Sequence, residues 1–128
     1  KVLKMHTGMD FTAPTGTEIY STGDGVVKKI EYAQRGYGYN VVIDHGFGYE
    51  TLYAHMSQII MRPGQKVKRG TVIGYVGNTG TSVAPHLHYE VIRNGNQVNP
   101  INYYFNDLSP EQYDKLVEIA SQPTQSFD

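Results

Sequence analysis

The middle of the chain alternates between short apolar or aromatic stretches and turns that contain glycine. The stretches are rich in Val, Ile, Tyr and Thr, the composition that is typical of β-strands. Each of them is too short for a membrane span and is bounded by turn-forming residues. We therefore expect strands over residues 26–31, 39–44, 49–55, 71–76 and 86–92.

The residues between these stretches predict antiparallel pairing. The Gly46-Phe47-Gly48 segment suits a hairpin, and Asn94-Gly95 readily takes the two positive φ angles of a two-residue hairpin turn. Further turns are expected at 62–65 and 68–70. The glycine-containing segment 77–81 lies directly upstream of two histidines, so it could form a rim over a site.

The pattern changes after Pro100. Residues 109–112 read Ser-Pro-Glu-Gln, a helix start with a hydroxyl cap, and Pro123 ends the segment. Between them an apolar stripe has helical spacing: Tyr113, Leu116, Val117 and Ala120. We thus expect a core over 1–101 and an acidic extension over 102–128 with a helix near 110–121. The predicted fold class is mainly β: an antiparallel, β-sandwich-like or barrel-sandwich-like domain of short strands with one C-terminal amphipathic helix.

Composition narrows the possible functions. A chain of 128 residues is one domain, and its net charge of −1 favours neither nucleic acid nor an anionic membrane as partner. No apolar run is long enough to cross a bilayer, so no membrane span is expected. Without cysteine, any metal site or catalysis must use other side chains, such as His, Asp or Glu. The chain begins with Lys1 and has no leader pattern, which suggests a processed or trimmed chain.

Two pairs of residues are candidate metal ligands. His86 and His88 lie two apart on a predicted strand, so they share a face about 6.6 Å apart, although such pairs also arise by chance. His6 and Asp10 form a second pair, and Gly8 between them favours a bent strand or loop over a helix. An alternative for this second pair is a solvated histidine and an aspartate that caps a turn.

Together the two pairs contain a two-histidine, one-carboxylate zinc set, which leaves a coordination position for water. Such an arrangement is typical of catalytic rather than structural zinc, and one histidine of the 86/88 pair would remain for proton transfer. His55 lies at the end of an apolar strand and has the alternative of a buried histidine bonded to backbone. His45 lies at a turn, where we expect a structural or exposed role.

Three segments, in this order, resemble the motifs of the lysostaphin-type (LytM-type) zinc metallopeptidases that cut peptidoglycan. They are residues 6–11 (HTGMDF), 53–57 (YAHMS) and 85–90 (PHLHYE). Residues 13–17, 23–27 and 72–80 are also similar to that family, so the resemblance runs from about residue 6 to residue 101. Three spaced motifs are far more specific than any one of them.

The resemblance implies a role for five residues. His6, Asp10 and His88 would bind Zn²⁺, while His86 and His55 would form the catalytic pair, with the order of their proton transfers left open. It also implies peptidoglycan stem or cross-bridge peptides as substrate, and a periplasmic or extracellular location in the cell envelope. Between direct D-alanyl cross-links and glycine bridges, we favour the first. The oligomeric state is not predicted.

The sequence departs from the family at its start and leaves two other functions open. Relatives usually have a strand ahead of the first motif, whereas five residues precede His6, so this ligand could be held less firmly. A second interpretation is an inert relative that binds cell-wall peptides or activates another wall hydrolase. A third takes residues 63–74 as a biotinyl or lipoyl carrier hairpin, although Lys66 and Lys68 lack the usual flanking Met or Asp.

Overall fold

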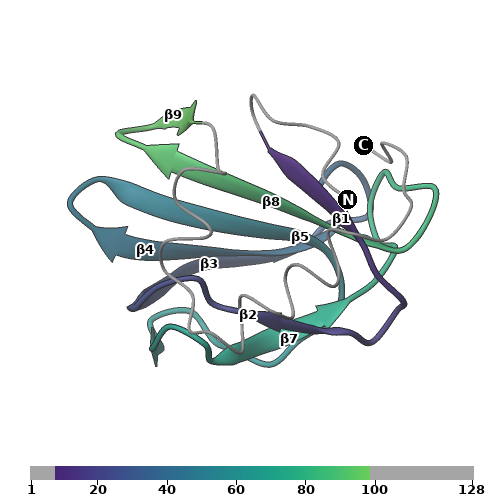
Figure 1. Cartoon of the computed structure of the whole chain (residues 1–128), viewed down its shortest axis with the longest axis horizontal. Coiled ribbons are helices and arrows are strands. Elements are labelled where there is room, and N and C mark those ends of the chain that lie inside the picture. The colour runs from purple at the N-terminus through teal and green to yellow at the C-terminus, as the bar shows by residue number, and fades with distance from the viewer. Residues whose placement is uncertain (1–7, 99–128) are drawn as a thin grey trace.

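The computed structural model describes residues 8–98, which form nine β-strands and no helix (Figure 1). The predicted antiparallel β class is confirmed within this range. The expected helix near 110–121, the division at residue 101 and the candidate ligand His6 lie outside the described residues. No helix among the residues that the structure describes could cross a membrane.

The strands follow one another with short connections. Their bounds are β1 (Met9–Thr12), β2 (Glu18–Tyr20), β3 (Gly25–Tyr32), β4 (Tyr39–Gly46), β5 (Tyr49–Ile59), β6 (Lys66–Val67), β7 (Val72–Val76), β8 (His86–Arg93) and β9 (Asn96–Val98).

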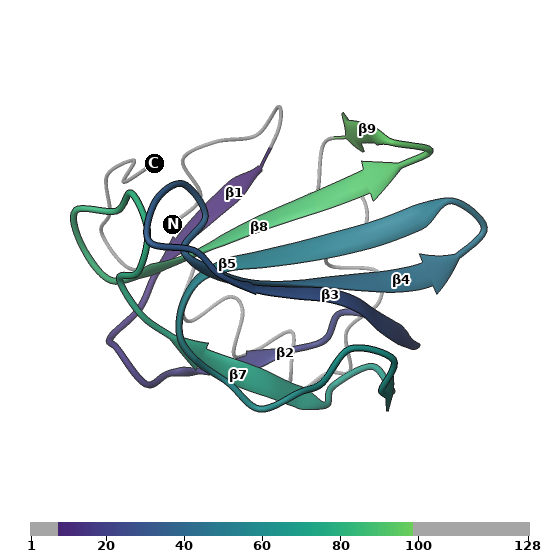
Figure 2. The same cartoon turned by 180° about the vertical axis from the view of Figure 1, so that it is seen from behind.

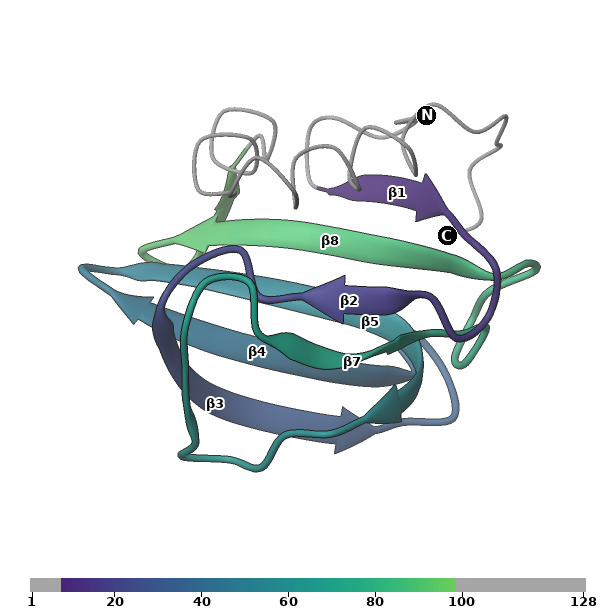
Figure 3. The same ribbon diagram turned by 60° about the horizontal axis from the view of Figure 1, so that its bottom comes forward.

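The strands are arranged in two layers. The larger layer has the order β1-β8-β5-β4-β3-β6, with β9 paired to β8, and every pairing is antiparallel. The smaller layer is the pair β2-β7, joined to the larger one because the end of β5 pairs with β7. Figure 3 shows β2 and β7 lying in front of the strands of the larger layer.

The main core lies between the two layers. From β8 it takes Leu87 and Tyr89, the two residues that the strand period assigns to the core, and from the smaller layer it takes Ile19 and Ile73. The alternate residues of β8 therefore point to the other face of the larger sheet. That face carries a second, smaller apolar cluster, of Val42, Leu52 and Ala54.

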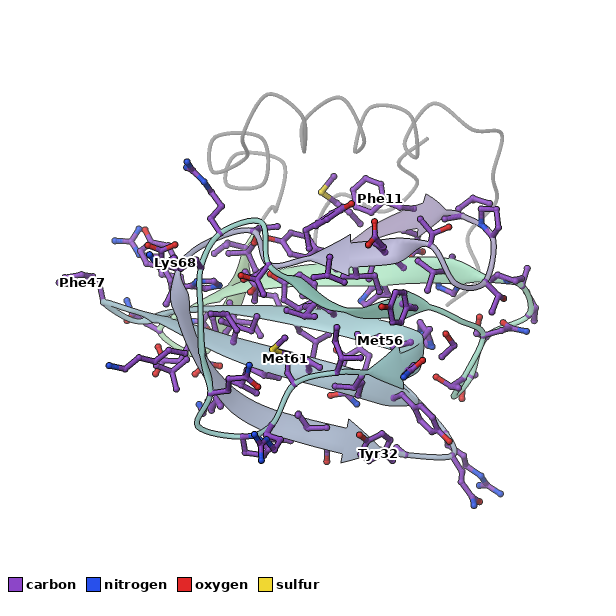
Figure 4. The ribbon with its side chains drawn as sticks, turned by 90° about the horizontal axis from the view of Figure 1, so that it is seen from below. Phe11, Tyr32, Phe47, Met56, Met61 and Lys68 are labelled. Atoms are coloured by element: carbon purple, nitrogen blue, oxygen red, sulfur yellow. The ribbon has the colours of Figure 1, made fainter. Side chains whose placement is uncertain are left out.

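The hairpin turns form as the sequence predicts. Asn94 and Gly95 have φ angles of 51° and 82° in the turn between β8 and β9. The β4–β5 hairpin turns at Gly46-Phe47-Gly48, where all three φ angles are positive. Phe47 stands at the tip of this hairpin and points away from the body of the protein, 99 % exposed (Figure 4). The predicted turns at 62–65 and 68–70 each close with a backbone hydrogen bond.

Four strands are not among those that the sequence predicts: β1, β2, β6 and β9. Each has two to four residues, too few to show a β-period of their own, and each forms because a longer strand is available to pair with it. The segment that resembles a carrier hairpin, residues 63–74, contains one of these short strands, β6. Lys66 lies within β6, paired with Val26 of β3, and is not at a hairpin tip.

Buried hydroxyl groups connect the segment after β2 with strands β5 and β8 of the larger layer. The hydroxyl of Tyr53 accepts a hydrogen bond from the backbone N–H of Thr22 at 3.0 Å and contacts the hydroxyl of Thr51 at 2.8 Å. Thr22 Oγ1 also lies 2.9 Å from the hydroxyl of Tyr89. Burial raises the pKa of Tyr53, an effect that these hydrogen bonds only partly oppose. The phenol is thus a neutral structural group.

We expect Tyr53→Phe to lower the free energy of unfolding by about 1–3 kcal/mol, because it leaves a buried backbone N–H without its acceptor. Urea denaturation followed by circular dichroism measures the change. Tyr32→Phe is the matched control, since Tyr32 is 59 % exposed, and it should leave the midpoint unchanged. Equal midpoints for Tyr53→Phe and the wild type would show that the buried hydroxyl is not needed.

Candidate metal and histidine site

The pairing of β1 with β8 brings Asp10 and His88 together. Asp10 is the direct cross-strand partner of His88, and both side chains lie on the sheet face away from β2 and β7. Nδ1 of His88 is 2.8 Å from Oδ1 of Asp10. Both residues are buried: His88 is 4 % exposed and Asp10 is 0 % exposed. Two of the three predicted zinc ligands are therefore in contact.

His86 lies on the same face of β8, as the spacing of two predicts. Its Nε2 is 3.8 Å from Oδ1 of Asp10. On the other side of the ring, Nδ1 lies 2.9 Å from the carbonyl oxygen of Ala84 and 3.1 Å from Oγ of Ser82. A carbonyl only accepts, so Nδ1 carries the proton and, in the neutral ring, Nε2 presents its lone pair toward Asp10.

His55 reaches the same cluster through an irregularity in β5. Val41 and Tyr39 of β4 face Tyr53 and Met56, so β5 has an extra residue between these two pairs. Within this bulge His55 has a φ of 60°, unusual for any residue but glycine and typical of a constrained functional position. Its ring centroid is 4.7 Å from that of His86 and 6.1 Å from that of His88.

Backbone groups hold His55 in place. Its N–H donates to the carbonyl of Tyr37 at 2.8 Å, and its Nδ1 donates to the carbonyl of Thr79 at 2.7 Å. As in His86, Nδ1 therefore carries the proton and Nε2 is the basic nitrogen of the neutral ring. The sequence analysis offers two interpretations of His55, a buried histidine bonded to backbone and a member of the catalytic cluster. The structure places His55 in both situations at once.

Two loops form a wall of the site. The loop 33–38 after β3 and the loop 77–85 before β8 lie together beside the start of β8 (Figure 2). Gly36 and Thr81 join them with two hydrogen bonds, of 2.9 Å each. At Gly38 a Cβ would lie 2.4 Å from the Thr79 backbone, so only glycine allows this approach. Segment 77–81 therefore borders the site, where the sequence analysis expects a rim.

Glu90 and Tyr37 also belong to the site, although the sequence analysis assigns neither a role. Oε2 of Glu90 is 2.8 Å from Nε2 of His88 and accepts a hydrogen bond from the hydroxyl of Tyr37. Burial alone would raise the pKa of Glu90, but its hydrogen bonds outweigh burial and hold the pKa below its ordinary value. A signal for Glu90 existed, because it continues the period-two face of His86 and His88. None existed for Tyr37, which comes from a loop.

The donor chemistry of the described residues fits a divalent metal ion. Each ring nitrogen of His88 faces a carboxylate, and a neutral imidazole can donate to only one of them. A cation between Nδ1 and Asp10 resolves this conflict, with the Nε2–H bonded to Glu90. Within residues 8–98 no three side chains form a complete metal site by themselves. The third predicted ligand, His6, lies outside this range.

His45 lies apart from this cluster. Its Nδ1 bonds to the carbonyl of Asp24 and its Nε2 to Oγ1 of Thr51, both at 2.7 Å. Both ring nitrogens are thus engaged in holding β4 against neighbouring segments, the structural role that the sequence predicts.

The described residues thus place a buried carboxylate–histidine pair beside two further histidines, on an antiparallel two-layer β fold. The family follows from comparison with known proteins: the chain belongs to peptidase family M23, whose model matches residues 4–100. This match confirms the resemblance to lysostaphin-type peptidases.

Individual relatives agree with this assignment. The chain is 45 % identical over 119 residues to the DD-carboxypeptidase/endopeptidase Mpg of Neisseria meningitidis serogroup B, covering 93 % of this chain and 27 % of that protein. It is 50 % identical over 97 residues to the peptidoglycan DD-endopeptidase ShyA of Vibrio cholerae, covering 73 % and 22 %. The chain thus spans about a quarter of the length of these relatives.

A solved structure shares the fold. The crystal structure of a zinc-containing peptidase from Vibrio cholerae superimposes with a TM-score of 0.71 at 41 % sequence identity, covering 73 % of this chain and 29 % of that one.

Gly8 provides a test of how tightly the site is packed. A Cβ at this position would lie 2.5 Å from Cε1 and 2.9 Å from Nε2 of His88. We expect Gly8→Ala to push the His88 ring out of place and to weaken zinc binding by roughly 10-fold or more, as for a displaced ligand. Gly95→Ala is the control, because a Cβ there meets nothing within 4 Å, although its φ of 82° predicts a small loss of stability.

Titration with zinc against a fluorescent chelator measures both variants. Zinc binding of Gly8→Ala equal to that of the wild type would show that the ring of His88 has room to move without consequence.

Proposed function

We propose that this protein is a zinc-dependent endopeptidase that hydrolyses peptide cross-links of bacterial peptidoglycan. The observation that carries the proposal is the contact of Asp10 with His88 beside the paired rings of His55 and His86. The names of the relatives support it, since ShyA is a peptidoglycan DD-endopeptidase and the structural neighbour is a zinc-containing peptidase.

In this proposal Asp10 and His88 bind Zn²⁺ together with His6. When bound, zinc supplies an acidified water and a Lewis acid that polarises the carbonyl of the scissile peptide bond. The protein keeps the two described ligands rigid, because each lies on a strand within a paired sheet and is shielded from solvent. Two histidines and one carboxylate leave a coordination position for reaction, as catalytic zinc sites require.

His55 and His86 are the proton-transfer residues. Both donate their Nδ1–H to backbone carbonyls, so both hold a basic Nε2 in a fixed orientation. One Nε2 takes the proton of the attacking water, and the imidazolium so formed stabilises the oxyanion and then donates this proton to the leaving amine. The two rings are close enough to share these roles, and which ring acts first is left open.

The preferred substrate is a direct D-alanyl cross-link. Mpg and ShyA are both named for action on DD bonds, which supports this choice over glycine bridges. A substrate of this kind places the protein in the periplasm or outside the cell. The inert alternative is not favoured, because Asp10, His55, His86 and His88 are all present and gathered in one cluster.

We expect His88→Ala to lose both zinc retention and hydrolysis, because it removes the ligand that contacts Asp10. The assay incubates the protein with purified peptidoglycan, with and without a chelator, and identifies the released peptides by mass spectrometry. The wild type should release stem peptides cut at the cross-link, and the chelator should stop the release. A His88→Ala protein that retains one zinc per chain would contradict the assignment.

His55→Ala and His86→Ala should each lower kcat by on the order of 10² or more while retaining zinc, as expected for proton-transfer and oxyanion roles. His45→Ala is the matched control, because His45 is a histidine outside the cluster, and its kcat should stay near that of the wild type in protein that is folded. Full activity in either test variant would remove that residue from the mechanism.

A further inference from the structure

We propose that Glu90 is the positioning residue of His88, and that it fixes which ring nitrogen His88 presents to the metal. The proposal rests on the proposed function only in that Asp10 and His88 bind the ion. It concerns a residue to which the proposed function assigns no role toward the substrate or the metal.

The contacts of the His88 ring define this role. Oε2 of Glu90 lies 2.8 Å from Nε2, on the opposite side of the ring from Nδ1, which lies 2.8 Å from Asp10. Both carboxylates only accept hydrogen bonds, and a neutral ring carries one proton, so it can satisfy only one of them. Because Asp10 is assigned to the ion, the proposal places the proton on Nε2, which faces Glu90. The lone pair of the neutral ring is then on Nδ1, where it points at Asp10 and is available to a cation between them.

Glu90 is itself held by residues from two other elements. Its Oε2 accepts a hydrogen bond from the hydroxyl of Tyr37, and its Oε1 accepts one of 2.8 Å from Nε2 of Gln97. Gln97 lies on β9, opposite Ile92 of β8, so the short β8–β9 hairpin places this donor. Glu90 is only 3 % exposed, and its position is therefore determined by the fold.

The same elements restrain the ring of His88 directly. The Tyr37 ring stacks on it, with centroids 5.7 Å apart and planes inclined by 22°. Gly8 lies against the ring edge at Cε1 and Nε2, where no Cβ would fit. The imidazole is therefore held at one face and at one edge. Glu90 sets how the ring is turned about its Cβ–Cγ bond and which ring nitrogen carries the proton.

A carboxylate on the far nitrogen of a ligand histidine has a known physical effect. It orients the ring and makes the ligand nitrogen more basic, and loss of such a partner typically costs about 10–100-fold in metal affinity. The extended period-two face of β8 thus carries three groups with separate tasks: proton transfer at His86, metal binding at His88 and positioning at Glu90.

The test compares the zinc dissociation constants of Glu90→Leu and Glu90→Gln with that of the wild type, by competition with a fluorescent chelator. Glu90→Leu removes the acceptor and should weaken zinc binding by about 10–100-fold. Glu90→Gln keeps a neutral acceptor and should recover part of the loss, to roughly 3–10-fold weaker than the wild type. Glu50→Gln is the control, because Glu50 pairs with Lys28 away from the site and should have no effect.

A second readout follows the ring proton itself. In the zinc-loaded wild type, the Nε2–H of His88 should give a downfield, slowly exchanging NMR signal, and Glu90→Leu should lose it. If Glu90→Leu does not fold by circular dichroism, Glu90→Gln decides. Zinc binding within twofold of the wild type in every folded Glu90 variant would overturn the proposal. Failure of the wild type to bind zinc would instead refute the metal site, so the two results are distinct.

Discussion

The antiparallel register of β1 on β8 is the constraint on which the site depends. It sets Asp10 of β1 opposite His88 of β8, a residue 78 positions away in the sequence. A slip of one residue would turn Asp10 to the core face and bring Met9 or Phe11 to the face that carries the His88 side chain. The register is held because Met9 and Phe11 are fully buried in the core on the other face. Hydrophobic burial on one side of β1 thus fixes a polar contact on the other.

Strand β5 supplies the second constraint. It pairs with β8 as far as Ala54 and with β7 from Met56 onward, so it passes from one layer to the other at His55. A non-glycine residue at a φ of 60° costs on the order of 1–3 kcal/mol, and it persists only where its surroundings fix it. Here the carbonyls of Tyr37 and Thr79 do so, and each belongs to one of the two wall loops. The strain at His55 and the geometry of the proposed catalytic pair therefore have the same origin.

The sequence predicts the parts of this structure that depend on local pattern. The five longer strands show β-branched and aromatic runs, Asn94-Gly95 specifies its turn, and the spacing of His86 and His88 specifies their shared face. The contact between Asp10 and His88 is not local, and β1 is too short to be predicted from a β-strand pattern of its own. Their residue types suggest a shared zinc set, and the resemblance to a family assigns both Asp10 and His88 to it, whereas strand period alone does not predict their contact. Tyr37 could not be predicted, because its place over His88 depends on how two loops pack through Gly38 and Gly80.

The most direct measurement of the central claim is anomalous diffraction at the zinc absorption edge, on crystals of the zinc-loaded protein. The account predicts a single strong peak about 2.0–2.2 Å from both Nδ1 of His88 and a carboxylate oxygen of Asp10, the distances of zinc–nitrogen and zinc–oxygen bonds. A zinc peak away from Asp10 and His88 would contradict the account, and so would a zinc ion in contact with Nε2 of His88 in place of Nδ1.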